Sequence, residues 1–118
     1  NNSTLGMVKL EMLVNGLPDF QTDVPDTNYA EIARAIGFHA ERVEDASRLE
    51  GAYREAFAAP GPALVEVITD PNALSLPPAI TGGQVVGFAT AMSKIVLNRG
   101  IAEAFSMATS NMRNIPRL

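Results

Sequence analysis

The side chains in this sequence that could do chemistry are an asparagine pair and a few isolated acids and bases. Asn1 and Asn2 offer carboxamide oxygens, and Glu11 offers a carboxyl group that could transfer protons if its surroundings adjusted its pKa. Alone, an asparagine pair is typical of a loop, and a lone glutamate is typical of a solvated surface. His39 is the only histidine and more typical of a structural role, and no Ser-His-Asp set can be assembled around it. These residues therefore indicate no particular reaction until their surroundings are considered.

Composition excludes several classes of function. The sequence has no cysteine, which excludes disulfides, thiolate metal sites and a cysteine nucleophile. A net charge of −4 gives no basic surface for nucleic acid. No run approaches the roughly 18 to 20 apolar residues of a transmembrane helix. Gly82-Gly83 lacks the preceding strand and the lysine of a phosphate-binding loop, so it is interpreted as helix punctuation.

The first half of the sequence predicts alternating helices and strands. An apolar stretch from Leu5 to Leu13 suggests a short helix that ends at Asn15-Gly16, and a polar surface loop is expected over residues 19–25. Asn28 and Glu31 form a capping pattern, and helical spacing follows it until Gly37. The elements expected next are a helix over 27–36, a strand over 38–43, a helix capped by Asp45 with Leu49, Ala52, Tyr53, Ala56 and Phe57 on its apolar face, and a strand over 63–68.

This order predicts an α/β fold with a parallel sheet. The strand over 63–68 is nearly continuous in apolar character, which is typical of an interior strand covered on both faces. Two strands cannot make a stable open sheet by themselves. Further strands are therefore expected either from residues that precede Asn1 or from an associated chain.

The second half predicts two amphipathic helices after a proline-rich linker over 70–78. One helix carries apolar residues from Val85 to Val96 and ends at Gly100. The other has Ile101, Ala104, Phe105, Ala108 and Met112 on one side and Glu103, Ser106, Ser110 and Asn111 on the other. The domain prediction is accordingly one segment over 1–78 and a helical extension over 79–118.

The opening segment resembles a known cofactor motif. Asn1-Asn2, with the residues that follow as far as Glu11, is similar almost position by position to the segment after the cofactor-binding strand of pyruvate oxidases and quinone-dependent pyruvate dehydrogenases. In that family the motif for thiamine diphosphate and magnesium starts with a Gly-Asp-Gly, which this sequence lacks. The chain is expected to be a C-terminal fragment of such an enzyme. The similarity continues through residues 26–33, 61–67, 73–78 and 87–88 and the terminal helices.

The resemblance implies which residues bind the coenzyme. A diphosphate needs a hard divalent cation, and Mg²⁺ takes oxygen ligands in octahedral geometry. Asn2 is implied to supply a side-chain oxygen to the metal and Thr4 a backbone carbonyl. The aspartate ligand and the glutamate that activates the coenzyme are implied to lie outside this chain, the latter on a neighbouring subunit. The expected cofactor-binding residues are Asn2, Thr4, Leu5, Gly6 and Met7.

Glu11 is the catalytic residue that the resemblance implies, close to the coenzyme and the substrate. Without the resemblance, Glu11 reads as an ordinary solvated carboxylate. Met7 faces the thiazolium in this reading, although membrane-associated relatives carry phenylalanine at this position.

The implied activity is oxidative decarboxylation of pyruvate, with electrons passed to FAD and then to a quinone or to oxygen. FAD would be bound by parts of the parent enzyme outside this chain. The resemblance also implies a homotetramer in the cytoplasm that includes the remainder of the parent polypeptide. The isolated chain is expected neither to bind the coenzyme nor to turn over substrate.

Two other functions stay open. An acetolactate synthase-like carboligase shares the fold and the Asn-Asn pair, but Lys9-Leu10-Glu11-Met12 follows the oxidase pattern. The chain could instead be a non-catalytic oligomerisation or membrane-docking fragment. In the quinone-dependent relatives a terminal amphipathic helix docks on the cytoplasmic face of the membrane, and residues 101–113 match its place. A helix packed on its own protein would show the same amphipathic pattern.

Overall fold

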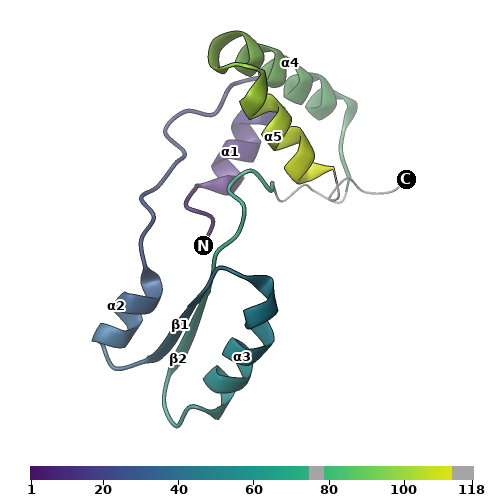
Figure 1. Cartoon of the computed structure of the whole chain (residues 1–118). Coiled ribbons are helices and arrows are strands. Elements are labelled where there is room, and N and C mark those ends of the chain that lie inside the picture. Colours follow the sequence, from purple (N-terminus) through teal and green to yellow (C-terminus); the bar gives the residue numbers. More distant parts are fainter. Residues whose placement is uncertain (75–78, 113–118) are drawn as a thin grey trace. The chain divides into compact units, whose positions relative to one another are not determined.

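The computed structural model describes residues 1–74 and 79–112, which form two compact units (Figure 1). The α/β unit contains residues 1–2 and 25–69, and the helical unit contains residues 3–24 and the described residues from 70 onward. The predicted division into 1–78 and 79–118 stays a prediction.

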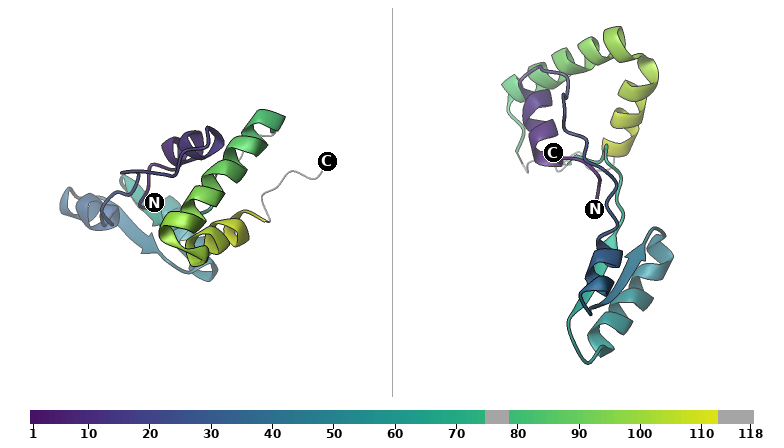
Figure 2. Two further views of the ribbon diagram at one scale, coloured as in Figure 1. Left: turned by 90° about the horizontal axis from the view of Figure 1, so that it is seen from above. Right: turned by 90° about the vertical axis from the view of Figure 1, so that its left-hand side faces the viewer.

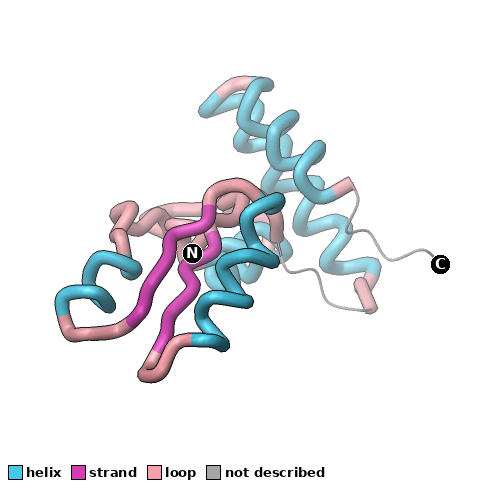
Figure 3. Tube along the Cα trace, turned by 60° about the horizontal axis from the view of Figure 1, so that its bottom comes forward, coloured by secondary structure: helices cyan, strands magenta, loops and turns pink. Residues whose placement is uncertain are grey.

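The α/β unit is built on two parallel strands, β1 (His39–Val43) and β2 (Ala63–Val67). Their register pairs His39 with Ala63 and Val43 with Val67. Helices α2 (Tyr29–Ala35) and α3 (Leu49–Ala58) contact both strands and lie on opposite sides of the pair (Figures 1 and 3). The predicted fold class, α/β with a parallel sheet, is confirmed.

Local hydrogen bonds explain where the elements of this unit begin and end. The Asn28 side chain accepts a hydrogen bond from the Glu31 backbone N–H at 3.0 Å and so caps α2. Gly37, with φ of +89°, allows the left-handed turn into β1. Asp45 accepts from Ser47 N–H at 2.9 Å and caps a short 3₁₀ helix, η1 (Ala46–Arg48), which leads directly into α3. The helix and strand predicted over 27–43 are confirmed.

The apolar face predicted for α3 is only partly buried. Ala52 is buried, whereas Tyr53 is exposed and the Phe57 side chain is 90% exposed. The predicted helix is therefore present, and only part of its apolar face is covered within this unit.

The helical unit consists of α1 (Gly6–Val14), α4 (Gly82–Arg99) and α5 (Ile101–Asn111). Helix α4 packs against both α1 and α5 (Figure 2). Thr81 and Gln84 form a reciprocal capping box at the start of α4. Gly82-Gly83 therefore lies in the first turn of α4, which agrees with its interpretation as a mark of a helix boundary. The core residues of this unit are Leu10, Leu13, Leu74, Ala91, Ile95 and Met107.

Three polar residues of the helical unit are more buried than the sequence suggests. The predicted loop over 19–25 is present and mostly exposed, but Asp19 and Thr22 within it are buried. Asn111, predicted on the polar side of α5, is buried as well. Its carboxamide accepts from the Leu74 N–H at 2.8 Å and donates to the Asn72 carbonyl at 2.7 Å. Asn111 therefore satisfies the backbone of the linker, a partner that helical periodicity does not reveal.

The predicted apolar side of α5 is largely exposed. Ile101, Phe105 and Met112 are all exposed, while Met107 is fully buried. An apolar groove of about 390 Å³ runs between Val14, Phe88 and Met107. Within residues 1–74 and 79–112, no helix has both the length and the apolar character needed to span a bilayer. Residues 75–78 of the predicted linker and Arg113 of the predicted membrane helix lie outside the described residues.

Candidate functional site

Asn1 extends the sheet of the α/β unit beyond β2. Its backbone nitrogen donates to the Val67 carbonyl at 2.7 Å, and its carbonyl accepts from the Thr69 N–H at 2.9 Å. Asn1 therefore bonds to the residues on either side of Ile68, which is the hydrogen-bond pattern between two parallel strands. On the other side, the Ile68 N–H donates to the Val43 carbonyl at 2.9 Å. Asn1 thus takes a third-strand position beside the end of β2.

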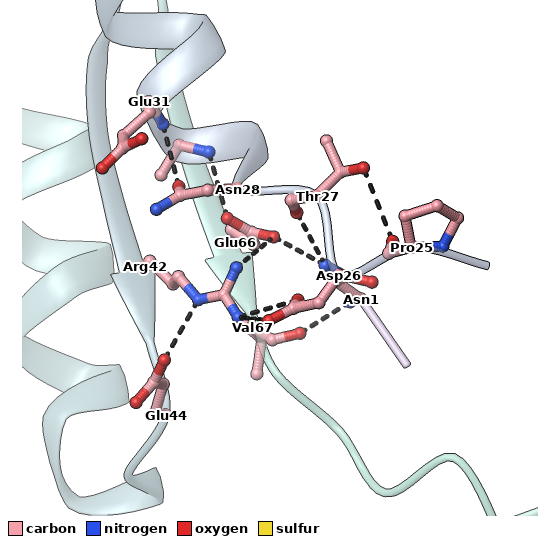
Figure 4. A network of polar contacts seen from close by, with 11 residues as sticks. Asn1, Pro25, Asp26, Thr27, Asn28, Glu31, Arg42, Glu44, Glu66 and Val67 are labelled. Carbon is pink, nitrogen blue, oxygen red and sulfur yellow. Dashed lines mark hydrogen bonds and ion pairs between the residues drawn. The ribbon is translucent and has the colours of Figure 1, made fainter. Parts of the chain in front are cut away.

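The Asn1 side chain is held by a buried carboxylate (Figure 4). Its Nδ2 donates to Glu66 Oε1 at 2.7 Å and to the Thr27 carbonyl at 3.1 Å. The other Glu66 oxygen, Oε2, accepts from the Ala30 N–H at 3.0 Å, in the first turn of α2. The positive end of that short helix therefore points at the same carboxylate as Asn1.

Glu66 is 5% exposed and is the most buried residue of β2. Burial by itself would raise the pKa of Glu66. Hydrogen bonds from the Asn1 side chain and from the backbone of Ala30 and Tyr29, together with the Arg42 charge, outweigh it and lower the pKa below its usual value.

Arg42 on β1 connects Glu66 to two more acids (Figure 4). Its Nη1 lies 3.5 Å from Glu66 Oε1, and its Nη2 donates to both Asp26 oxygens at 2.9 Å. Its Nε donates to Glu44 at 3.1 Å. The Arg42 side chain is mostly buried, and its positive charge partly compensates the buried Glu66 carboxylate, whereas Asp26 and Glu44 are exposed to solvent.

We predict that the charge on Glu66 makes stability depend on pH in the acid range. Because the folded pKa lies below the unfolded value of about 4.3, its contribution is present above that value and is lost as pH falls through the folded pKa. The free energy of unfolding of the 118-residue chain, measured with a chemical denaturant, should therefore fall between about pH 6 and pH 3. Its slope against pH should be shallower in Glu66→Gln, by the equivalent of up to one proton. Parallel curves for the two proteins would contradict this prediction.

In the helical unit, Thr4 is paired with Asp23 in an isolated antiparallel bridge. The Leu5 N–H donates to the Thr22 carbonyl at 2.7 Å, and the Val24 N–H donates to the Ser3 carbonyl at 3.0 Å. Both bonds use backbone groups on either side of Thr4 and not its own, as in a non-hydrogen-bonded antiparallel pair. The Thr4 hydroxyl donates to the Thr22 carbonyl at 3.1 Å, which holds this residue in place.

Ser3 adopts a left-handed backbone conformation, with φ of +48°. Non-glycine residues seldom do so, and such strain persists only where the surrounding structure enforces it. The strained position lies between Asn2 and Thr4.

Helix α1 presents two predicted site residues on its exposed side. Met7 and Glu11 are one turn apart and exposed, while Leu10 and Leu13 face the core. Gly6 begins α1 and Leu5 is its N-cap. The structure therefore places Thr4, Leu5, Gly6, Met7 and Glu11 together at the start of α1 in the helical unit, and Asn2 beside Asn1 in the α/β unit.

His39 is exposed at the first position of β1, and the predicted chemistry does not involve it. Glu66 and Arg42, by contrast, belong to the neighbourhood of Asn1 and were not predicted. A signal for Glu66 exists in the sequence, because a charged residue inside the apolar run Ala-Leu-Val-Glu-Val-Ile must find a partner if the strand is buried.

Comparison with known proteins shows the family of this chain. The chain belongs to the thiamine pyrophosphate enzymes, because residues 1–67 match the C-terminal TPP binding domain of that family. Among curated proteins, YdaP of Bacillus subtilis (strain 168), named for containing thiamine pyrophosphate, is 36% identical over 94 residues. The acetolactate synthase large subunit IlvG of Mycobacterium tuberculosis (strain ATCC 25618 / H37Rv) is 46% identical over 48 residues.

These matches cover different shares of the chain. The YdaP match includes 80% of this chain and the IlvG match 41%. The chain spans only 16% of the length of YdaP and 9% of that of IlvG. The predicted assignment to a C-terminal thiamine diphosphate-binding domain is confirmed.

Proposed function

We propose that this chain is the C-terminal part of a thiamine diphosphate- and FAD-dependent pyruvate oxidoreductase, the parent enzyme. The observation that carries the proposal is the family match over residues 1–67, which contains Asn2, Thr4 and Glu11. The Lys9–Met12 segment supports the oxidase branch of the family, because it follows the pattern of pyruvate oxidases.

The donor atoms at the start of the chain fit a partial Mg²⁺ site. Asn2 has a carboxamide oxygen and Thr4 a backbone carbonyl, and Mg²⁺ prefers such hard oxygen ligands. Among the residues that the structure describes, no group of three or more His, Cys, Asp or Glu could form a different metal site. Asn2 and Thr4 would hold the cation of the coenzyme diphosphate together with ligands from elsewhere in the parent enzyme.

Thiamine diphosphate, when bound, supplies the electron sink for decarboxylation of a 2-oxo acid. Met7 and Glu11 would face the substrate from the exposed side of α1. Met7 would exclude water from the reacting group, and the Glu11 carboxylate would accept or return a proton there. Leu5 and Gly6 would let the chain approach the coenzyme at the start of the helix.

Acetolactate synthase is the second candidate, supported by the IlvG match. The two functions share the first half of the reaction and differ in the fate of the electrons. An oxidoreductase passes an electron pair to FAD, whereas a carboligase joins two 2-oxo acids without net electron transfer.

An assay of the parent enzyme with pyruvate and a quinone or dye acceptor separates the two. We expect reduction of the acceptor in step with release of carbon dioxide. Formation of acetolactate without reduction of the acceptor would reject the oxidoreductase and establish the carboligase. The Glu11→Gln variant should lower kcat about 100-fold or more if this carboxylate transfers a proton.

The wider assembly belongs to the same proposal. FAD would be bound outside this chain, the parent enzyme would be a homotetramer in the cytoplasm, and the final acceptor would be a quinone or oxygen. The exposed apolar side of α5 would contact the membrane surface or the remainder of the parent polypeptide.

A further inference from the structure

Glu66 is a buried charge that the proposed chemistry does not use. Moving an ionised carboxylate out of water costs several kcal/mol unless hydrogen bonds and opposite charges compensate it. An apolar side chain would suit a strand of this composition better if packing were its only task. The partners of Glu66 therefore indicate what the carboxylate does.

Asn1 is one of the partners that Glu66 binds, together with Ala30 and Arg42. Of the two carboxylate oxygens, Oε2 is bound to α2 through Ala30, and Oε1 accepts the short 2.7 Å bond from Asn1 Nδ2. Hydrogen bonds to an ionised acceptor are stronger than neutral ones. Glu66 thus connects the N-terminal turn of α2 to the Asn1 side chain, and Arg42 supports it from β1.

Hydrogen bonds from both its backbone and its side chain hold Asn1 in place. Its backbone N–H and C=O bind Val67 and Thr69, and its Nδ2 binds Glu66 and Thr27. The peptide unit that joins Asn1 to Asn2 is planar, so its six atoms move together. When the Asn1 Cα and carbonyl oxygen are held, the nitrogen and Cα of Asn2 are held with them.

We propose that Glu66 is a positioning residue for the metal ligand Asn2, acting through Asn1. The proposal rests on the proposed function in one respect only, namely that Asn2 binds the Mg²⁺ of the coenzyme. It does not depend on which product the enzyme forms. Loss of an outer partner of a metal ligand typically weakens metal binding about 10- to 100-fold.

The test is equilibrium binding of thiamine diphosphate and Mg²⁺ to the parent enzyme, followed by calorimetry without substrate. We expect Glu66→Ala to lower the affinity for Mg²⁺, measured with coenzyme present, about 10- to 100-fold. Excess Mg²⁺ should then restore coenzyme binding. Glu66→Gln should give a smaller loss, because an amide nitrogen would face one of the N–H donors. Asn1→Ala should resemble Glu66→Ala, since it removes the same contact and leaves the Glu66–Ala30 bond intact.

Two controls make the result decisive. Ala52→Gly weakens α3, on the other side of the strands from α2, and should leave Mg²⁺ binding unchanged. Asn2→Ala removes the proposed ligand and should abolish Mg²⁺-dependent binding. If Asn2→Ala weakens binding but Asn1→Ala and Glu66→Ala stay within twofold of wild type, the positioning role is rejected and the proposed function stands. If Asn2→Ala has no effect, both proposals fail.

Discussion

Replacing Gly87 with alanine should destabilise the helical unit by about 3 kcal/mol, although alanine is normally the better helix former. Gly87 lies where α4 crosses the end of α1. A Cβ at this position would come within 1.9 Å of the Val14 carbonyl oxygen and 2.7 Å of its carbonyl carbon. Both contacts are with backbone, so no side chain can rotate away. The helices would have to separate, which urea unfolding of the 118-residue chain should show as a lower midpoint.

Gly83→Ala is the matched control, because Gly83 lies in the same helix and a Cβ there meets nothing within 4 Å. This change should stabilise the chain by about 0.5–1 kcal/mol through helix propensity. The two substitutions are chemically identical and should have opposite signs. An unchanged or raised midpoint for Gly87→Ala would show that α1 and α4 do not approach this closely.

Replacing Asp19 with alanine should cost about 3–5 kcal/mol, because it leaves a buried cation without its partner. Asp19 and Lys9 are each 4% exposed, and their charged atoms are 3.8 Å apart. Arg99 also donates to the Asp19 carboxylate at 3.1 Å. Lys9 would keep its hydrogen bond to Asn72 at 3.1 Å but lose its counter-charge. Urea unfolding, followed by circular dichroism, measures the loss.

The exposed ion pair between Glu50 and Arg54 serves as the control for Asp19. Its Glu50 and Arg54 side chains are 86% and 75% exposed, and its 2.7 Å contact is shorter than that of the Lys9–Asp19 pair. Solvent screening nevertheless limits such a pair to about 0.3–0.5 kcal/mol. Glu50→Ala should therefore change stability little. A loss for Asp19→Ala no larger than that for Glu50→Ala would show that the Lys9–Asp19 pair is solvated.

The Gly87→Ala and Asp19→Ala variants should also affect the segment that we propose binds the coenzyme. Lys9 belongs to the same helix as Met7 and Glu11, and Gly87 sets how closely this helix approaches α4. A variant that shifts α1 would change where the predicted substrate-facing side chains lie.

Local sequence patterns predicted most of the secondary structure. The Asn28 cap, the glycines at 37 and 100 and the apolar run over 63–68 act within a few residues of themselves, so their effects can be read from neighbours in the chain. The resemblance carried by Asn1-Asn2 likewise indicated the family before any fold was known, because a motif is a local string.

Only the tertiary structure decided which polar groups are buried and what they bind. Glu66 and Asn1 are 65 residues apart, Asp19 and Arg99 are 80 apart, and the partner of Asn111 is a linker backbone 37 residues away. A hydrophobic face follows from periodicity, since any apolar surface can cover it. A buried charge needs one particular partner at one distance and angle, and that partner is brought close only when the whole chain has folded.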